Sequence, residues 1–338
     1  MKIKQMGRTG LKVSEICLGT MTFGNQADEP TSFAIMDVAD AAGVNFIDTA
    51  DAYPLGGDLE QTGSTETIIG NWLKARNKRD QTVLATKCRG RMGPLPNDEG
   101  LSRRHIIKAC EDSLRRLQTD YIDLYQFHMP DVNTPLEESL RAADDLVRAG
   151  KVRYMGCSNY PAWQMMQGLW LSDKYNLARF DCDQPRYNML FRMIEDEIVP
   201  MCLANGVGII AYNPLAGGML TDRYVNANAR QTSSDMRFGL KNSGELYRKR
   251  YWNEAIFDEV ERLHGYFAGK GKSLAHVALA WVLMRPGITS AILGASKPEQ
   301  LTDSLGGVDL ALDVDDLAAC EQSWFNLPRE QDTTVARR

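Results

Sequence analysis

The chain has 338 residues, of which 43% are hydrophobic and 25% charged, and its formal net charge is −5. This composition is typical of a globular protein, and it offers no field of clustered lysine and arginine to hold nucleic acid or an anionic membrane. The N-terminus lacks the apolar core of a signal peptide, and no run of roughly 18 apolar residues occurs. We therefore expect a cytoplasmic protein that binds neither nucleic acid nor membrane, and the sequence leaves its oligomeric state open.

The seven cysteines are scattered along the chain, without a Cys-x-x-Cys motif or a histidine pair at metal-ligand spacing. This pattern predicts mostly buried, reduced thiols and no metal site.

The predicted elements begin with a hairpin, because "GRTG" lies between two short arms within the first 15 residues. Short β-rich runs then alternate with amphipathic helical stretches. The candidate strands are 16–20, 45–49, 82–87, 122–128, 154–159, 182–187, 208–213 and 291–295. Helices are predicted over 102–118, 135–149, about 252–268 and 273–285.

This alternation predicts an α/β fold, a (β/α)8 TIM barrel that forms a single domain over residues 1–338, with a doubly wound open sheet as the alternative. The interval between the seventh and eighth strands is much longer than the others and must hold an insertion. Within it, residues 217–250 are polar and predict a mobile flap. The tail from about 326 to 338 lacks a hydrophobic pattern and is expected to be frayed.

Polar side chains gather at the ends of successive predicted strands, where barrels of this kind carry their chemistry. The second, third and fourth strands end in Asp48, Lys87 and His128, and Tyr53 follows on the loop after the second. Any one of these residues could be a helix cap, a surface group or a core residue. Together they predict one site, in which Asp48 holds Lys87 by an ion pair and Lys87 lowers the pKa of Tyr53, making it a usable acid. His128 would orient the carbonyl group that is protonated.

Six successive motifs, "NFIDTADAY", "LATK", "YQFHMPD", "GCSNY", "AYNPLAGGML" and "AILGASKPEQL", resemble those of the aldo-keto reductase superfamily. The resemblance extends from about residue 5 to residue 310. It implies that Asp48, Tyr53, Lys87 and His128 are the catalytic tetrad, with Tyr53 as the general acid in the reduction of an aldehyde or ketone. It also implies that NADPH supplies the hydride and that the partner is a small-molecule carbonyl compound.

The same resemblance implies the residues that hold the cofactor. Ser158, Asn159 and Gln184 are expected at the carboxamide, with Tyr212 stacked on the nicotinamide ring. Ser296 and Lys297, beside a helix that starts near Pro298, are expected at the 2′-phosphate, and Gln300 at the adenosine. The complete expected set is Gly19, Thr20, Met21, Asp48, Ser158, Asn159, Gln184, Tyr212, Asn213, Pro214, Leu215, Gly217, Gly218, Arg223, Arg237, Gly294, Ser296, Lys297 and Gln300.

The chain departs from the family pattern beside the expected substrate pocket. Pro54 follows the tyrosine where glycine is common, and "LGGDLEQTG" lengthens the loop before "STETIIG". Ser304 stands where the family often has asparagine at an adenine contact. Phe23, Trp163 and Phe191 are candidates for an aromatic pocket lining, although core packing explains each about as well.

Two other functions remain open. The chain also resembles the β subunits of voltage-gated potassium channels, which would make it a cofactor-binding regulatory subunit. Lys87 could alternatively form a Schiff base in a barrel lyase. The sequence "GVGIIA" at 206–211 matches a dinucleotide-binding fingerprint. It follows a helix and precedes a strand, which is the reverse of the order in a Rossmann fold, so it does not predict one.

Overall fold

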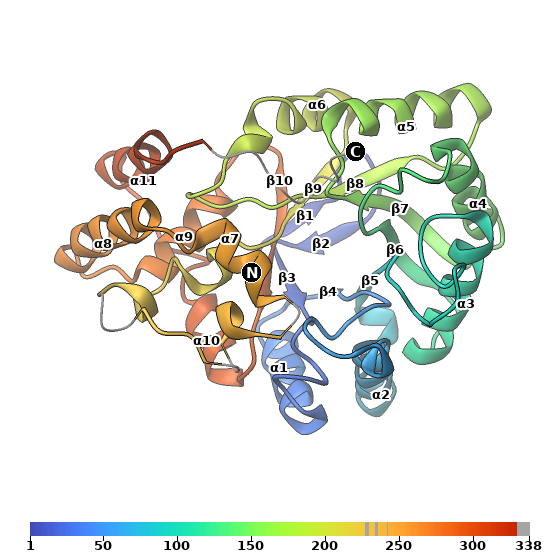
Figure 1. The fold of residues 1–338 in the computed structure, drawn as a ribbon, viewed down its shortest axis with the longest axis horizontal. Helices are drawn as coiled ribbons and strands as arrows, with labels where there is room; N and C mark the ends of the chain where they lie inside the picture. Colours follow the sequence, from blue (N-terminus) through green and yellow to red (C-terminus); the bar gives the residue numbers. More distant parts are fainter. Residues whose placement is uncertain (227–229, 234–235, 242, 330–338) are drawn as a thin grey trace.

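The computed structural model describes residues 1–226, 230–233, 236–241 and 243–329. Eight parallel strands close into a barrel in the order β10-β3-β4-β5-β6-β7-β8-β9, with helices around them (Figure 1). The strands are β3 Ile16–Gly19, β4 Phe46–Asp48, β5 Val83–Cys88, β6 Ile122–Phe127, β7 Val152–Ser158, β8 Phe180–Gln184, β9 Gly208–Ala211 and β10 Ile288–Gly294. The predicted (β/α)8 barrel is confirmed, and the open sheet is wrong because β10 pairs with both β3 and β9.

The predicted N-terminal hairpin consists of β1 (Ile3–Gln5) and β2 (Lys12–Ser14), paired antiparallel. Its turn is joined to the barrel by a hydrogen bond from Arg8 N to Gly206 O of 2.8 Å. Met6 and Val13 are fully buried and complete a core cluster inside the barrel. The hairpin therefore covers the N-terminal end of the barrel and leaves the opposite end for a site.

The helices pack their apolar faces onto the outside of the barrel. Figure 1 shows α1 and α2 below the barrel, α3 and α4 at the right, and α5 and α6 above it. Their bounds are α1 Glu29–Ala41, α2 Ser64–Arg76, α3 Arg103–Leu117, α4 Leu136–Arg148, α5 Ala162–Tyr175, α6 Ile198–Asn205, α7 Gly244–Tyr251, α8 Glu254–Gly269, α9 Leu274–Leu283, α10 Pro298–Leu305 and α11 Val314–Asn326. The four predicted helices correspond to α3, α4, α8 and α9, and Ser102 caps α3 by accepting from His105 N.

The insertion between β9 and β10 is more ordered than its polar sequence predicts. Helix α7 begins within the predicted flap of residues 217–250, and its Tyr247 and Tyr251, one helical turn apart, are buried. Phe238 packs against Tyr224 and Trp252 with ring centroids 5.3 and 5.1 Å apart. The described second half of this segment is therefore a packed helix rather than a loop, because aromatic residues bury it, and the mobile flap stays a prediction.

The C-terminal part also differs from the expectation. Residues 314–326 form α11, which the sequence reasoning did not anticipate, and Leu327 is buried after it. Most of the predicted frayed tail, residues 330–338, lies outside the described residues.

Candidate active site

A buried ion pair lies at the base of the candidate site. Asp48 ends β4 and Lys87 lies on the neighbouring strand β5, where both side chains are almost completely buried. Lys87 Nζ donates to Asp48 Oδ2 at 2.5 Å and to Thr49 O at 2.8 Å. The pair predicted from the two strand ends is therefore present in the structure.

Two amides complete the coordination of Asp48. Gln126 and Gln184 donate to Asp48 Oδ1 through their Nε2 atoms at 3.0 and 2.9 Å. Gly156 on β7 makes room for this arrangement, because an added Cβ would lie 3.1 Å from the Gln126 Cγ atom. The carboxylate thus accepts three charge-assisted hydrogen bonds, which fix its position below the cavity.

Gln126 was missed by the sequence reasoning, although a signal for it exists. It lies on β6 two residues before His128, so the period-two alternation of a strand points both side chains toward the same face. A polar residue in the otherwise apolar run before a site histidine was the available clue.

Tyr53 and His128 lie beside the ion pair. The Tyr53 ring is 5.1 Å from Lys87 Nζ, and its centroid is 5.8 Å from that of His128 in an edge-on arrangement. Tyr53 and His128 both line the cavity above the buried Lys87. The structure therefore brings the four predicted residues of the tetrad together.

The protonation of the site differs in one respect from the expectation. Burial raises the pKa of Tyr53 above its ordinary value, and the Lys87 ammonium offsets only part of this effect. The nearby ammonium by itself predicts a lower pKa for Tyr53, and that prediction is wrong because burial has the larger effect. Tyr53 consequently carries its proton at neutral pH.

The neighbours of Tyr53 have defined charges as well. Burial opposes the charge of Lys87, but Asp48 and Tyr53 favour it strongly enough to raise the pKa of Lys87. Burial, with Lys87 and Arg89 nearby, lowers the pKa of His128 to about 3. At neutral pH the site therefore contains an ammonium, a protonated phenol and a neutral imidazole.

A chain of hydrogen bonds follows on β7 and β9. Tyr212 Oη donates to Asn159 Oδ1 at 2.8 Å. Asn159 Nδ2 donates to Ser158 Oγ and to His128 O at 2.9 and 3.0 Å. These bonds hold three of the expected cofactor residues next to the tetrad.

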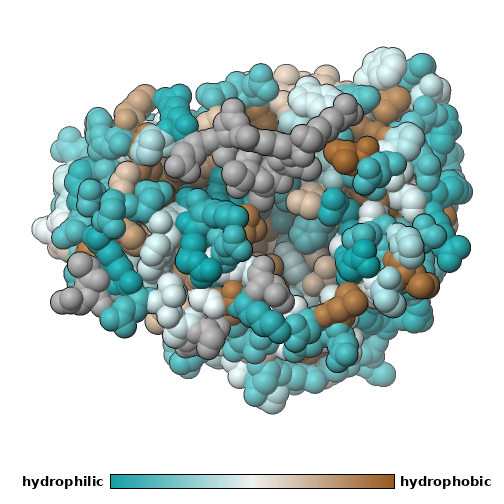
Figure 2. Space-filling view, in the orientation of Figure 1, coloured by the Kyte–Doolittle hydropathy of each residue, from teal (hydrophilic) through white to brown (hydrophobic). Residues whose placement is uncertain are grey.

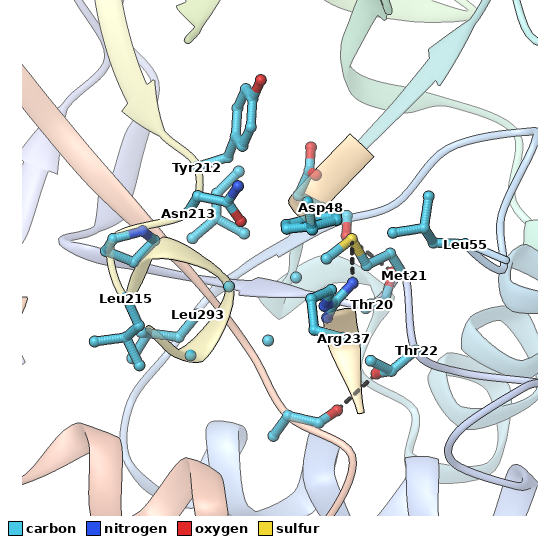
Figure 3. A pocket seen from close by; sticks show the side chains of 18 of the residues that line it. Thr20, Met21, Thr22, Asp48, Leu55, Tyr212, Asn213, Leu215, Arg237 and Leu293 are labelled. Atoms are coloured by element: carbon cyan, nitrogen blue, oxygen red, sulfur yellow. Dashed lines mark hydrogen bonds between the residues drawn. The ribbon is translucent and has the colours of Figure 1, made fainter. Parts of the chain in front are cut away.

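A cavity of about 590 Å³ opens over these residues at the C-terminal end of the barrel. It is lined by every residue of the expected cofactor set except Lys297. Figure 3 shows Tyr212 and Asn213, which directly follow β9, beside the cavity, and a dashed line marks the contact of 3.4 Å from Arg237 Nη1 to Met21 Sδ. Lys297 lies outside this lining, exposed at the N-cap position of α10.

The lining also differs from the expected pocket. Phe23, Trp163 and Phe191 are absent from the described residues that line the cavity. Phe23 and Phe191 are buried in the core, whereas Trp163 on α5 is 66% exposed. Phe23 and Phe191 therefore follow the core-packing alternative, and Trp163 neither lines the cavity nor packs in the core. Tyr247 and Arg250 of α7, which lie within the predicted flap, line the cavity.

The cavity has the properties needed to hold an anionic dinucleotide. Asn213 Nδ2 is buried and has no hydrogen-bond partner among the described residues. Arg237 forms no ion pair with a described carboxylate, and a Cβ added to Gly218 would meet nothing within 4 Å. An unused donor, an unpaired cation and open space beside the backbone fit a nucleotide phosphate.

The closed barrel, with an ion pair, a tyrosine and a neutral histidine beneath a nucleotide-sized cavity, has the architecture of a barrel oxidoreductase. A model of the Aldo/keto reductase family matches residues 15–324, and the chain belongs to this family. It is accordingly an oxidoreductase that uses a nicotinamide cofactor and acts on a small molecule.

The chain is similar over almost its whole length to several known proteins. It is 38% identical to "Uncharacterized oxidoreductase YrpG" of Bacillus subtilis, with 93% of each chain covered. It is 37% identical to "Protein tas" of Escherichia coli, covering 95% of this chain and 97% of that protein. It is 35% identical to "Probable voltage-gated potassium channel subunit beta" of Arabidopsis thaliana, with 92% of each covered.

Three further findings concern the surface, membrane-spanning helices and metal ligands. Figure 2 shows mainly hydrophilic side chains on the face viewed in Figure 1. Among the described helices, none is long and apolar enough to cross a membrane. The described part of the chain contains no group of three or more histidine, cysteine, aspartate or glutamate residues arranged to hold a metal ion.

Proposed function

We propose that the protein is an NADPH-dependent reductase that converts an aldehyde or ketone to an alcohol, with Tyr53 as the proton donor. The observation that carries this proposal is the buried Asp48–Lys87 pair beside Tyr53 at the floor of the cavity. A bound dihydronicotinamide supplies the hydride. The remaining roles belong to the side chains of this protein.

Tyr53 donates its proton to the carbonyl oxygen as negative charge develops there. The Lys87 ammonium stabilises the phenolate that remains, because an adjacent positive charge favours the charged form of a phenol. Asp48 keeps the ammonium in place through the ion pair. His128, neutral at the pH of the reaction, orients the carbonyl by donating a hydrogen bond without competing as an acid.

Tyr53→Phe tests this mechanism. The variant should lower kcat by roughly 100-fold or more, which is the usual contribution of a positioned acid, while NADPH still binds. Tyr154→Phe removes one hydroxyl from β7 outside the cavity and serves as the matched control. Near-normal aldehyde reduction by Tyr53→Phe, followed as NADPH absorbance, would remove Tyr53 from the mechanism.

The proposed preference for NADPH over NADH is supported by the start of α10. Ser296 lines the cavity, and its backbone N and Oγ contact Gln300 Oε1 at 2.9 and 3.2 Å. The first turn of a helix favours an anion such as the 2′-phosphate. Because Lys297 is exposed at the N-cap, its ammonium would act on the phosphate from outside the cavity lining.

The preference is tested by comparing kcat/KM for the two cofactors on one aldehyde. Replacing Ser296 and Lys297 by alanine should raise KM for NADPH and change KM for NADH little. A ratio near one in the unmodified protein would contradict the preference. If kcat/KM fell equally with both cofactors, the two residues would maintain the fold rather than select the cofactor.

The regulatory alternative is favoured by the similarity to the Arabidopsis protein named as a channel subunit. A regulatory subunit would bind cofactor without needing turnover, so multiple turnovers of an aldehyde support the reductase. The lyase alternative requires a neutral, accessible amine. The complete burial of Lys87 and its raised pKa argue against that reaction, and borohydride trapping of substrate on Lys87 would argue for it.

A further inference from the structure

Arg89, the first residue after β5, places a positive charge in the cavity, and no carboxylate in the described part of the chain pairs with it. Its side chain is partly buried and lines the cavity with Tyr53 and His128. Arg89 Nε donates to Pro130 O at 3.2 Å, which fixes the direction of the guanidinium. Its two terminal nitrogens donate to no described residue, and no described carboxylate forms an ion pair with it.

The carboxylate of Asp131 interacts electrostatically with Arg89 but is hydrogen-bonded elsewhere. Asp131 Oδ2 accepts hydrogen bonds from Leu101 N and Thr134 Oγ1 at 2.7 and 2.8 Å. Its Oδ1 accepts from Asn133 N at 2.9 Å. The carboxylate therefore organises the loop after β6 and leaves the terminal nitrogens of Arg89 available.

The backbone of Arg89 is unusual for a residue with a long side chain. Its φ is 120°, a value that favours glycine, and its carbonyl oxygen accepts from Gly100 N at 3.0 Å. The following Gly90 packs so closely that an added Cβ would meet Ala52 Cβ at 2.3 Å. A strained residue directly after a site strand is an observation that points to function.

The barrel order separates Arg89 from the expected cofactor residues. Its strand, β5, lies between β4 and β6, which lead to Tyr53 and His128. The expected cofactor contacts come mainly from the ends of β7, β8, β9 and β10 and from the segments that follow them. Arg89 therefore lies on the side of the cavity where the carbonyl compound, rather than the cofactor, has to enter.

We propose that the substrate is a carbonyl compound that also carries an anionic oxygen group, a carboxylate or a phosphate, and that Arg89 binds this group. The assignment rests on the proposed reductase function and narrows its substrate class. A guanidinium presents paired N–H donors in a rigid fork that matches either oxygen group. The anionic group takes no part in the reduction, and its binding holds the carbonyl carbon near Tyr53.

The test compares charged and neutral aldehydes of similar shape. One pair is 4-carboxybenzaldehyde and 4-methylbenzaldehyde, and the other is glycolaldehyde phosphate and glycolaldehyde. Values of kcat/KM are measured with NADPH for the unmodified protein and for Arg89→Met, Arg89→Lys and Arg91→Met. Arg91 is the matched control because its guanidinium pairs with Glu99 at 2.6 Å, both side chains are about half exposed, and it does not line the cavity.

The unmodified protein should prefer at least one charged aldehyde over its neutral counterpart, and the pair that shows the larger preference identifies carboxylate or phosphate. Arg89→Met should reduce that preference about 10- to 100-fold, the size expected for lost hydrogen bonds to a charged group. Arg89→Lys should restore part of it, and Arg91→Met should keep it. No preference for charge in the unmodified protein, or equal losses on charged and neutral aldehydes in Arg89→Met, would overturn the assignment.

A binding measurement separates this inference from the proposed function. Calorimetry with benzoate and with inorganic phosphate, with and without NADP+, needs no turnover. Weaker binding of one probe to Arg89→Met than to Arg91→Met supports an anion site at Arg89 even if no aldehyde is reduced. Reduction of neutral aldehydes together with probe binding unaffected by Arg89→Met would leave the reductase standing and remove the anion site.

Discussion

Replacing Lys87 by methionine should destabilise the fold as well as stop the proposed reaction. Asp48 and Lys87 are 2% and 0% exposed, so the variant leaves a carboxylate in the protein interior without its ammonium. Removing one partner of a buried pair typically costs about 3–5 kcal/mol of unfolding free energy. Gln126 and Gln184 still donate to Asp48 Oδ1, which places the expected loss near the lower end of that range.

A second substitution separates the effect of the unpaired charge on stability from the effect of lost packing. Combining Lys87→Met with Asp48→Asn removes both charges and keeps an oxygen that can accept from the two glutamines. The double variant should therefore be more stable than Lys87→Met alone, while both remain inactive in aldehyde reduction. Lys151→Met, which breaks an exposed pair with Glu111, should cost no more than about 1 kcal/mol.

The measurement is equilibrium unfolding in urea at pH 7, with circular dichroism to follow the folded fraction. If the double variant were less stable than Lys87→Met alone, the uncompensated carboxylate would not be the source of the instability. If Lys87→Met reduced aldehydes at the normal rate, the ammonium would have no role beyond the fold.

Three further predictions follow from buried and exposed groups. Because the pKa of His128 is about 3 in the folded protein and about 6.5 when unfolded, stability should fall as pH falls through this window, by up to about 2 kcal/mol from this group between pH 7.5 and 5. His128→Gln should lack this contribution, so its unfolding free energy should depend less on pH. The same pH dependence in the two proteins would contradict the prediction. Burial raises the pKa of Asp183 to about 8, so Asp183→Asn should gain stability relative to the unmodified protein as pH rises from 4 to 8, and a constant difference would refute this. Arg223 is exposed and lines the cavity, so saturating NADPH should slow trypsin cleavage after it, and an unchanged rate would argue against a flap that closes over the cofactor.

The barrel could be predicted from the sequence because short β-rich runs alternate regularly with helical stretches, and polar residues lie at the ends of several of these runs. Strand ends in a closed parallel barrel meet at one mouth, so Asp48, Lys87 and His128 could be assigned to one site without coordinates. The hydrogen bond from Lys87 Nζ to Asp48 Oδ2 agrees with that reasoning for the ion pair.

Other features depend on tertiary packing and could not be obtained in the same way. The polarity of residues 217–250 concealed α7, whose two buried tyrosines are recognisable only once the aromatic cluster around Phe238 is known. The direction of the Tyr53 pKa shift required the extent of burial, which competes with the nearby ammonium. Arg89 comes directly after Lys87 and Cys88 in the sequence, but only the folded loop shows that no described carboxylate pairs with it.

The positive charges around the cavity explain why the histidine and the tyrosine can have different roles in the proposed reaction. An imidazole with an ordinary pKa near 6.5 would be partly protonated at neutral pH and would compete with the phenol as an acid. Burial, Lys87 and Arg89 all act to keep His128 neutral, so it can orient a carbonyl but carries no extra proton to give. Tyr53 keeps its proton because burial outweighs the effect of the ammonium, and that ammonium then favours the phenolate once the proton has been transferred. The guanidinium proposed to bind an anionic substrate therefore also helps to leave Tyr53 as the acid of the site.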